Sequence, residues 1–211
     1  MSGNVDMTPG VEQWMALSDA LLAGLVHAMN NRVTALSVCA ELAALGDEEM
    51  LSGGVLTGEV NRLQRTNARI GLLPARAQLP EALELRPVLD DAIALHAHHP
   101  RMRSIECTLN AHDAMQPLRA PRWALLRLLL ILVDAAKESV AESASCTTVQ
   151  LHSDECSVQV RFTARSDSGP YGAAMAARCG ATLMRDGSEL VLTFPSLLVL
   201  RQRERRVSAG G

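Results

Sequence analysis

The sequence predicts an α+β protein in which an N-terminal antiparallel helical hairpin precedes an α/β sandwich. Up to residue 73 the apolar residues recur at helical spacing, whereas from residue 85 onward helical and alternating, strand-like stretches follow one another. A short linker bounded by Pro74 and Pro80 separates the two patterns. Hydrophobic residues make up 48% of the 211 residues, which is enough to bury a core and excludes a chain that is disordered throughout.

The hairpin is expected over residues 8–74. One long helix is predicted over residues 8–45, with Gly46 just past its end, and a second over residues 55–73 after a break at 52–54. Because two helices cannot cover their own apolar faces, we expect a homodimer in which two hairpins form a four-helix bundle. The apolar stripe expected in that bundle consists, on the first helix, of Leu22, Leu25, Met29, Val33 and Leu36.

The second domain is expected over residues 81–196. A strongly apolar stretch at 122–140 indicates a buried helix, and the order of the elements predicts one layer of sheet under helices. Residues 197–211 are expected to form a charged, mobile tail. The other predicted elements are a helix at 85–99, a strand at 104–109, antiparallel strands at 147–152 and 157–162 around an Asp154-Glu155 turn, a helix at 171–179, and a hairpin at 181–194 that turns at Asp186-Gly187.

Composition argues against several classes of protein. Aromatic residues are 2% of the chain and the net charge is −3, so neither base stacking nor a basic surface indicates nucleic-acid binding. No apolar stretch approaches the roughly 20 residues of a membrane span, and no membrane association is expected. The five cysteines are scattered without a CxxC pair, which favours a reduced, cytoplasmic compartment and no metal site. The run His96-Ala-His-His99 is interpreted as a helix end.

The segment that carries chemistry lies in the middle of the first helix. His27 falls off the apolar stripe, and helical spacing puts Asn31 and Thr34 on its face. A neutral imidazole can accept a phosphoryl group on a ring nitrogen, and Asn31 could bind a phosphoryl oxygen or orient a water. Periodicity alone is equally satisfied by a solvated surface histidine.

The stretch from His27 to Leu36, HAMNNRVTAL, resembles the phosphoacceptor box of sensor histidine kinases, usually written H-E-x-N-N-P-L-T-x-I. Residues 122–139 resemble the helix that carries the nucleotide-binding asparagines of that family, and residues 180–183 and 190–195 resemble its last strands. The resemblance covers about residues 15–196. It implies a dimerisation and phosphotransfer hairpin followed by a histidine kinase ATPase-like sandwich.

The chain departs from the family pattern where ATP chemistry is carried. Ala28 replaces the acidic residue that serves as the general base, and Arg32 replaces the usual proline. In the nucleotide helix, Leu130 and Asp134 stand where the two asparagines belong, although Asp134 could still hold Mg²⁺. The loop at 167–169, Asp-Ser-Gly, keeps only half of the D-x-G-x-G motif. The expectation is a domain that keeps the fold and has lost ATP.

This combination resembles dimeric histidine phosphotransferases built on a kinase-like body. The resemblance implies that His27 relays a phosphoryl group between aspartates of response-regulator receiver domains, with Mg²⁺ supplied by the receiver and no cofactor of its own. Arg32 is the expected charge-stabilising residue, and Arg62 and Arg65 are weaker candidates. The alternatives are an autophosphorylating kinase, a non-catalytic docking module for receivers, and a phosphatase in which Asn31 positions water.

Overall fold

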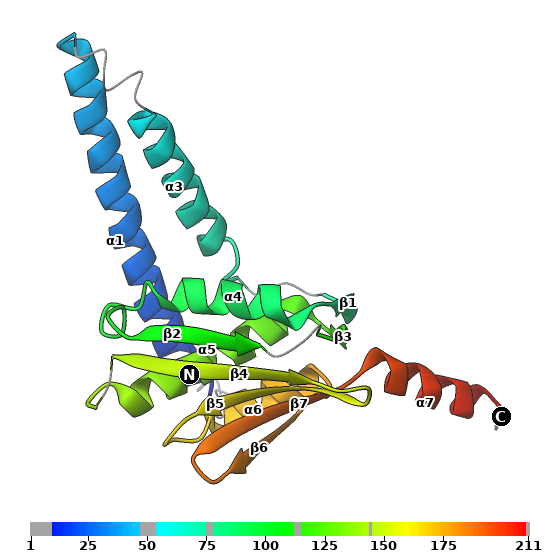
Figure 1. Ribbon diagram of the computed structural model, residues 1–211. Coiled ribbons are helices and arrows are strands. Elements are labelled where there is room, and N and C mark those ends of the chain that lie inside the picture. The colour runs from blue at the N-terminus through cyan, green and yellow to red at the C-terminus, as the bar shows by residue number, and fades with distance from the viewer. Residues whose placement is uncertain (1–9, 47–53, 75–77, 112–114, 144, 210–211) are drawn as a thin grey trace, which may run out of the picture.

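The computed structural model describes residues 10–46, 54–74, 78–111, 115–143 and 145–209. Two helices, α1 (Val11–Ala44) and α3 (Val55–Ile70), form an antiparallel hairpin that projects from the rest of the molecule (Figure 1). The expected hairpin is confirmed within the described residues, while the expected helix start at residue 8 and most of the break at 52–54 lie outside them.

Helix α1 has two apolar faces rather than the single stripe predicted. Its N-terminal half runs down against the body of the protein, where it contacts α5 and α6 and where Trp14 stacks on Tyr171. Leu25 is fully buried on that side, whereas Leu22 and Val33 of the predicted stripe are 36% and 49% exposed. A single chain therefore covers only part of the predicted stripe, and burial of Leu22 and Val33 in a dimeric bundle stays a prediction.

The body is built on a five-stranded mixed sheet with strand order β2-β4-β5-β7-β6. Only β2 and β4 are parallel; the other neighbours are antiparallel. Both predicted turns are confirmed: the Asp154 carboxylate accepts hydrogen bonds from the backbone N–H groups of Cys156 and Ser157, and Asp186 pairs with Glu189. The strands span Glu106–Ala111 (β2), Cys146–Ser153 (β4), Ser157–Thr163 (β5), Thr182–Asp186 (β6) and Glu189–Pro195 (β7).

Three helices cover one face of this sheet: α4 (Leu85–His96), α5 (Arg122–Val140) and α6 (Gly169–Arg178) (Figure 1). Helix α5 is the centre of the core, and its bounds coincide with the predicted ones. The sheet side chains that face it are fully buried, at Val149, Val158, Val160 and Phe162. The molecule is therefore an α+β protein with one layer of sheet under helices, as predicted.

Two smaller features were not predicted from the sequence. Strands β1 (Glu81–Leu83) and β3 (Leu118–Ala120) pair in a separate two-stranded sheet, and three residues are too few to show an alternating pattern. No secondary structure was predicted for the charged tail, in which Leu197–Ala209 forms helix α7, projecting beyond β7 (Figure 1). The buried Ser196 accepts the Val199 N–H and starts this helix. No helix in the described parts of the chain is long and apolar enough to cross a bilayer.

Candidate functional site

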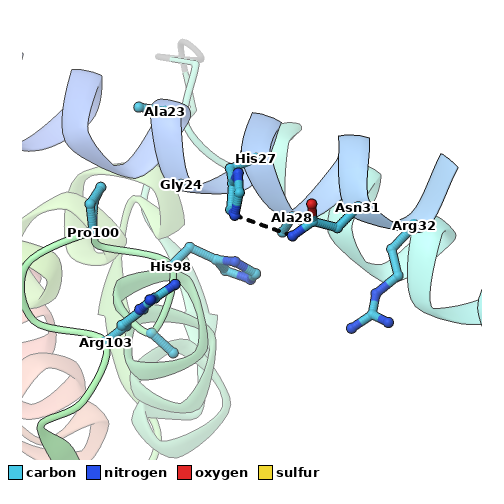
Figure 2. Close-up of a pocket in the computed structure, with 10 residues that line it drawn as sticks. Ala23, Gly24, His27, Ala28, Asn31, Arg32, His98, Pro100 and Arg103 are labelled. Atoms are coloured by element: carbon cyan, nitrogen blue, oxygen red, sulfur yellow. Dashed lines mark hydrogen bonds between the residues drawn. The ribbon is translucent and has the colours of Figure 1, made fainter. Parts of the chain in front are cut away.

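His27 is exposed on α1, beyond the part of the helix that packs on the body. Its Nε2 lies 3.2 Å from Nδ2 of Asn31, one helical turn further on (Figure 2). An amide nitrogen can only donate, so Nε2 accepts this hydrogen bond and the ring proton resides on Nδ1. Asn31 thus lies beside His27 on one face of α1, as the helical spacing predicts, whereas the hydroxyl of Thr34 donates to the Asn30 carbonyl of its own helix.

A groove of about 460 Å³ separates this part of α1 from the segment that follows α4. Small residues on α1 allow the segment to come close: a Cβ at Gly24 would lie 1.7 Å from the carbonyl oxygen of His98. We call this space the His27 groove. It is lined by Ala23, Gly24, His27, Ala28, Asn31, Arg32, Ala97, His98, Pro100 and Arg103, and none of these described residues bears a carboxylate.

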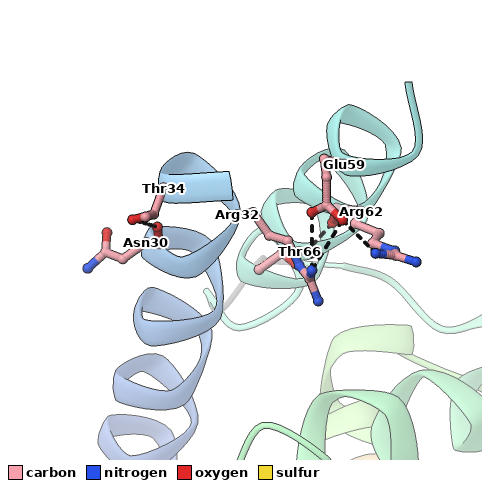
Figure 3. A network of polar contacts seen from close by, with 6 residues as sticks. All are labelled: Asn30, Arg32, Thr34, Glu59, Arg62 and Thr66. Atoms are coloured by element: carbon pink, nitrogen blue, oxygen red, sulfur yellow. Dashed lines mark hydrogen bonds and ion pairs between the residues drawn. The ribbon is translucent and has the colours of Figure 1, made fainter. Parts of the chain in front are cut away.

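Arg32 lines the groove and forms an ion pair with an acidic residue of the second helix. Its Nη1 donates to Oε2 of Glu59 on α3 at 3.1 Å, and Arg62 pairs with the same carboxylate (Figure 3). Burial raises the pKa of Glu59, but the hydrogen bonds and charges of Arg32 and Arg62 outweigh that effect and hold the pKa below its ordinary value. Arg65, the other weak candidate, is exposed on α3.

The body contributes two groove residues that the sequence did not single out for this role, His98 and Arg103 (Figure 2). Arg69 of α3 lies behind the first of them, with its Nη1 3.1 Å from Nε2 of His98. Burial and, next, the charge of Arg69 lower the pKa of His98, so the ring is neutral at pH 7 and accepts this hydrogen bond. Sequence spacing could not find these residues, because they approach His27 only through tertiary packing.

The positions that the resemblance connects with nucleotide binding are engaged within the chain. Asp134 accepts a hydrogen bond from Nε2 of the buried His96 at 2.8 Å, and Leu130 is fully buried in the core. Asp167 forms an ion pair with Arg185 at 2.6 Å. Lys137, also buried, donates to the Met102 carbonyl at 3.5 Å. In the described residues no three His, Cys, Asp or Glu side chains gather as a metal site.

No model of a protein family matches the chain, and no curated protein matches it. Solved structures that are similar include the Acinetobacter baumannii histidine kinase AdeS, with 14% identity, a TM-score of 0.42, and coverage of 81% of this chain and 96% of that one. A histidine kinase from Burkholderia phymatum STM815 has 20% identity, a TM-score of 0.40, and coverage of 85% and 96%. A structure described as a bacterial phosphotransferase has 12% identity, a TM-score of 0.40, and coverage of 85% and 95%. At such identities and TM-scores these likenesses do not assign an activity.

Proposed function

We propose that this protein is a histidine phosphotransferase in which His27 relays a phosphoryl group between aspartates of response-regulator receiver domains. The observation that carries the proposal is the placement of His27: the imidazole is exposed on a projecting helix and lines a groove that has cationic and no carboxylate side chains. A phosphoryl group carries negative charge in transfer, so such surroundings favour it over a neutral ligand.

The chemistry follows from the hydrogen bond to Asn31. With the ring proton on Nδ1, the nucleophilic lone pair of the imidazole is on Nε2. This nitrogen attacks the phosphorus of an aspartyl phosphate. A nitrogen–phosphorus bond forms, the bond from phosphorus to the aspartate oxygen breaks, and the carboxylate leaves. The incoming phosphorus displaces the Asn31 amide from Nε2, and the amide is then placed to donate to a phosphoryl oxygen. Mg²⁺ would come with the receiver domain.

The proposal excludes ATP as the donor. Its support is that Ala28 supplies no general base beside His27, that Leu130 is buried and offers no ligand, and that the Asp134 carboxylate is taken by His96. An active autophosphorylating kinase remains the competing proposal, and labelled ATP distinguishes the two.

We further propose that the protein acts as a cytoplasmic homodimer. Exposed apolar side chains continue along α1 at Met15, Leu22, Val26 and Val33, with spacings of seven and four residues. That spacing is typical of a helix that packs along a second helix. We call these four exposed residues the α1 seam. A second copy of the hairpin presents the same seam, so the two copies can pack against each other about a twofold axis in a four-helix bundle.

The decisive experiment mixes the purified chain with candidate receiver domains that carry labelled phosphate, and measures acid-labile label on the chain. The wild type should take up label and lose it to a second receiver, whereas His27→Ala should take up none. A parallel reaction with labelled ATP and Mg²⁺ should leave the wild type unlabelled. Label from ATP alone would overturn the exclusion of ATP, and receiver binding without label in the wild type would favour a docking module. Faster receiver dephosphorylation that is lost in Asn31→Ala would favour a phosphatase.

A further inference from the structure

The His27 groove has two sides: the stalk side, formed by α1 of the hairpin, and the body side, formed by residues 97–103 after α4. Positive charge that is not paired with an acid lies on the body side. On the stalk side, Arg32 is paired with Glu59. On the body side, Arg103 is exposed, and in the described part of the chain no carboxylate lies within ion-pair distance of it. Arg103 is therefore the guanidinium of this groove whose positive charge is not already matched by an acid.

His98, on the body side of the groove, is in close contact with both helices of the hairpin. The carbonyl oxygen of His98 lies so close to α1 that no side chain fits at Gly24, one turn before His27. From the other direction, Arg69 of α3 hydrogen-bonds the His98 ring. Figure 2 shows His98 and Arg103 beneath α1, on the side toward which His27 points. Three segments far apart in sequence thus form one preorganised wall.

We infer that His98 and Arg103 form the body-side half of an anion site that binds the phosphoryl group while His27 is being phosphorylated. This inference rests on the proposed function for its role, and on the groove itself for the site. A guanidinium presents a planar fork of N–H donors that matches two oxygens of a tetrahedral anion. The groove volume, about 460 Å³, is within the range of small-molecule pockets and admits a phosphoryl group together with the side chain that bears it.

The first test needs no phosphotransfer. Inorganic phosphate is titrated into ¹⁵N-histidine-labelled protein while the imidazole resonances are followed. The His27 and His98 signals should move in the wild type, and Arg103→Ala should weaken the apparent affinity about tenfold, as expected for loss of a charged hydrogen bond. Arg101→Ala is the matched control, because Arg101 is exposed on the same segment but lines a different groove, beside Asp134. It should titrate like the wild type. An unchanged titration in Arg103→Ala overturns the inference whatever the function of the protein.

The second test measures the reaction with phosphoramidate, a donor that needs no receiver. Its phosphorus–nitrogen bond breaks, ammonia leaves, and the phosphoryl group passes to Nε2 of His27. Arg103→Ala should slow labelling about tenfold and Arg103→Lys should recover part of the rate, because lysine keeps the charge without the fork. Equal rates in Arg103→Ala and the wild type overturn the inference. A wild type that takes label neither here nor from receivers would instead refute the proposed function, while the phosphate titration would still decide on the anion site.

Discussion

Glu59 determines how much positive charge Arg32 presents to the groove. The sequence suggested Arg32 for charge stabilisation on the basis of its distance from His27 along the helix, but the structure directs its guanidinium to a carboxylate on α3. Arg62 binds the same carboxylate, so one acid holds two of the three arginines that the sequence had suggested (Figure 3). Arginines near His27 therefore differ in how much positive charge they present to the groove, because some are paired with a carboxylate.

The Glu59 cluster predicts an acid-dependent loss of hairpin stability. The pKa of Glu59 in the folded protein is held below its ordinary value of 4.5. The ionised Glu59 side chain therefore contributes fully to the free energy of unfolding above pH 4.5, and this contribution is lost as the pH falls through the lowered pKa of the folded state. Glu59→Gln should therefore show a weaker fall in melting temperature between pH 6 and pH 3 than the wild type. Thermal unfolding followed by circular dichroism tests this. Glu41→Gln, an exposed change on α1, should keep the wild-type acid dependence; identical curves for Glu59→Gln and the wild type would contradict the prediction.

At the scale of elements, the contact between α1 and the segment after α4 depends on one glycine. Gly24→Ala should destabilise the protein by about 1–3 kcal/mol, because the added methyl group meets the His98 backbone and forces the two elements apart. Urea unfolding measures the change. Gly58→Ala in α3 is the control: nothing lies within 4 Å of a Cβ at that position, so it should stabilise the helix by up to about 1 kcal/mol. Equal stability of Gly24→Ala and the wild type would show that the contact is not tight.

The exposed seam of α1 predicts a dimer that charge can dissociate. Val26→Glu or Val33→Glu should convert the dimer to a folded monomer, because the carboxylate would be buried without a partner in the bundle. Sedimentation velocity with circular dichroism measures both properties. Leu25→Glu should instead unfold the chain, since Leu25 is buried within it, and Met184→Glu, at an exposed site on β6, should change neither property. A monomeric wild type would refute the four-helix bundle.

At the scale of the whole molecule, Arg127 of α5 joins the hairpin to the body. Its guanidinium lies 4.4 Å from the ring centre of Trp14 and donates hydrogen bonds to the Tyr171 hydroxyl and the Leu73 carbonyl. It therefore contacts the base of α1, the end of the segment that follows α3, and α6 at once. We therefore expect Arg127 to help hold the hairpin in its orientation on the body, together with the Trp14–Tyr171 stack.

Arg127→Ala should accordingly destabilise the protein by about 2–3 kcal/mol, from the lost cation–π contact and charged hydrogen bonds. Both tryptophans of the chain lie within 5.2 Å of the Arg127 guanidinium, so denaturation followed by tryptophan fluorescence reports directly on the site. Arg178→Ala removes the contact of the Arg178 guanidinium with the Trp123 ring and should cost less than about 1 kcal/mol. Equal losses in the two variants would contradict this role for Arg127.

Sequence patterns determined the order of the main elements, the two turns of the sheet, and the meeting of His27 with Asn31. These features depend on residues that are close together in the sequence. Helical or alternating periodicity shows which of these residues share a face of a helix or strand. The same patterns could not reveal β1 and β3, which are too short to show a period. They also assigned no helix after Ser196, where α7 begins with four apolar residues ahead of the charged run.

Only the tertiary structure decided which apolar positions of α1 are buried within the chain and which cations face His27. Both depend on the packing of the hairpin against a body that lies far along the sequence, through Trp14 and Tyr171 at its base and through Gly24 and His98 beside the groove. Packing between distant parts of the chain decides which apolar face of α1 becomes buried. Local sequence patterns do not contain this information, because both faces of the helix are apolar. The sequence by itself thus determined the imidazole and its amide partner, while the packed fold decided the walls of the site.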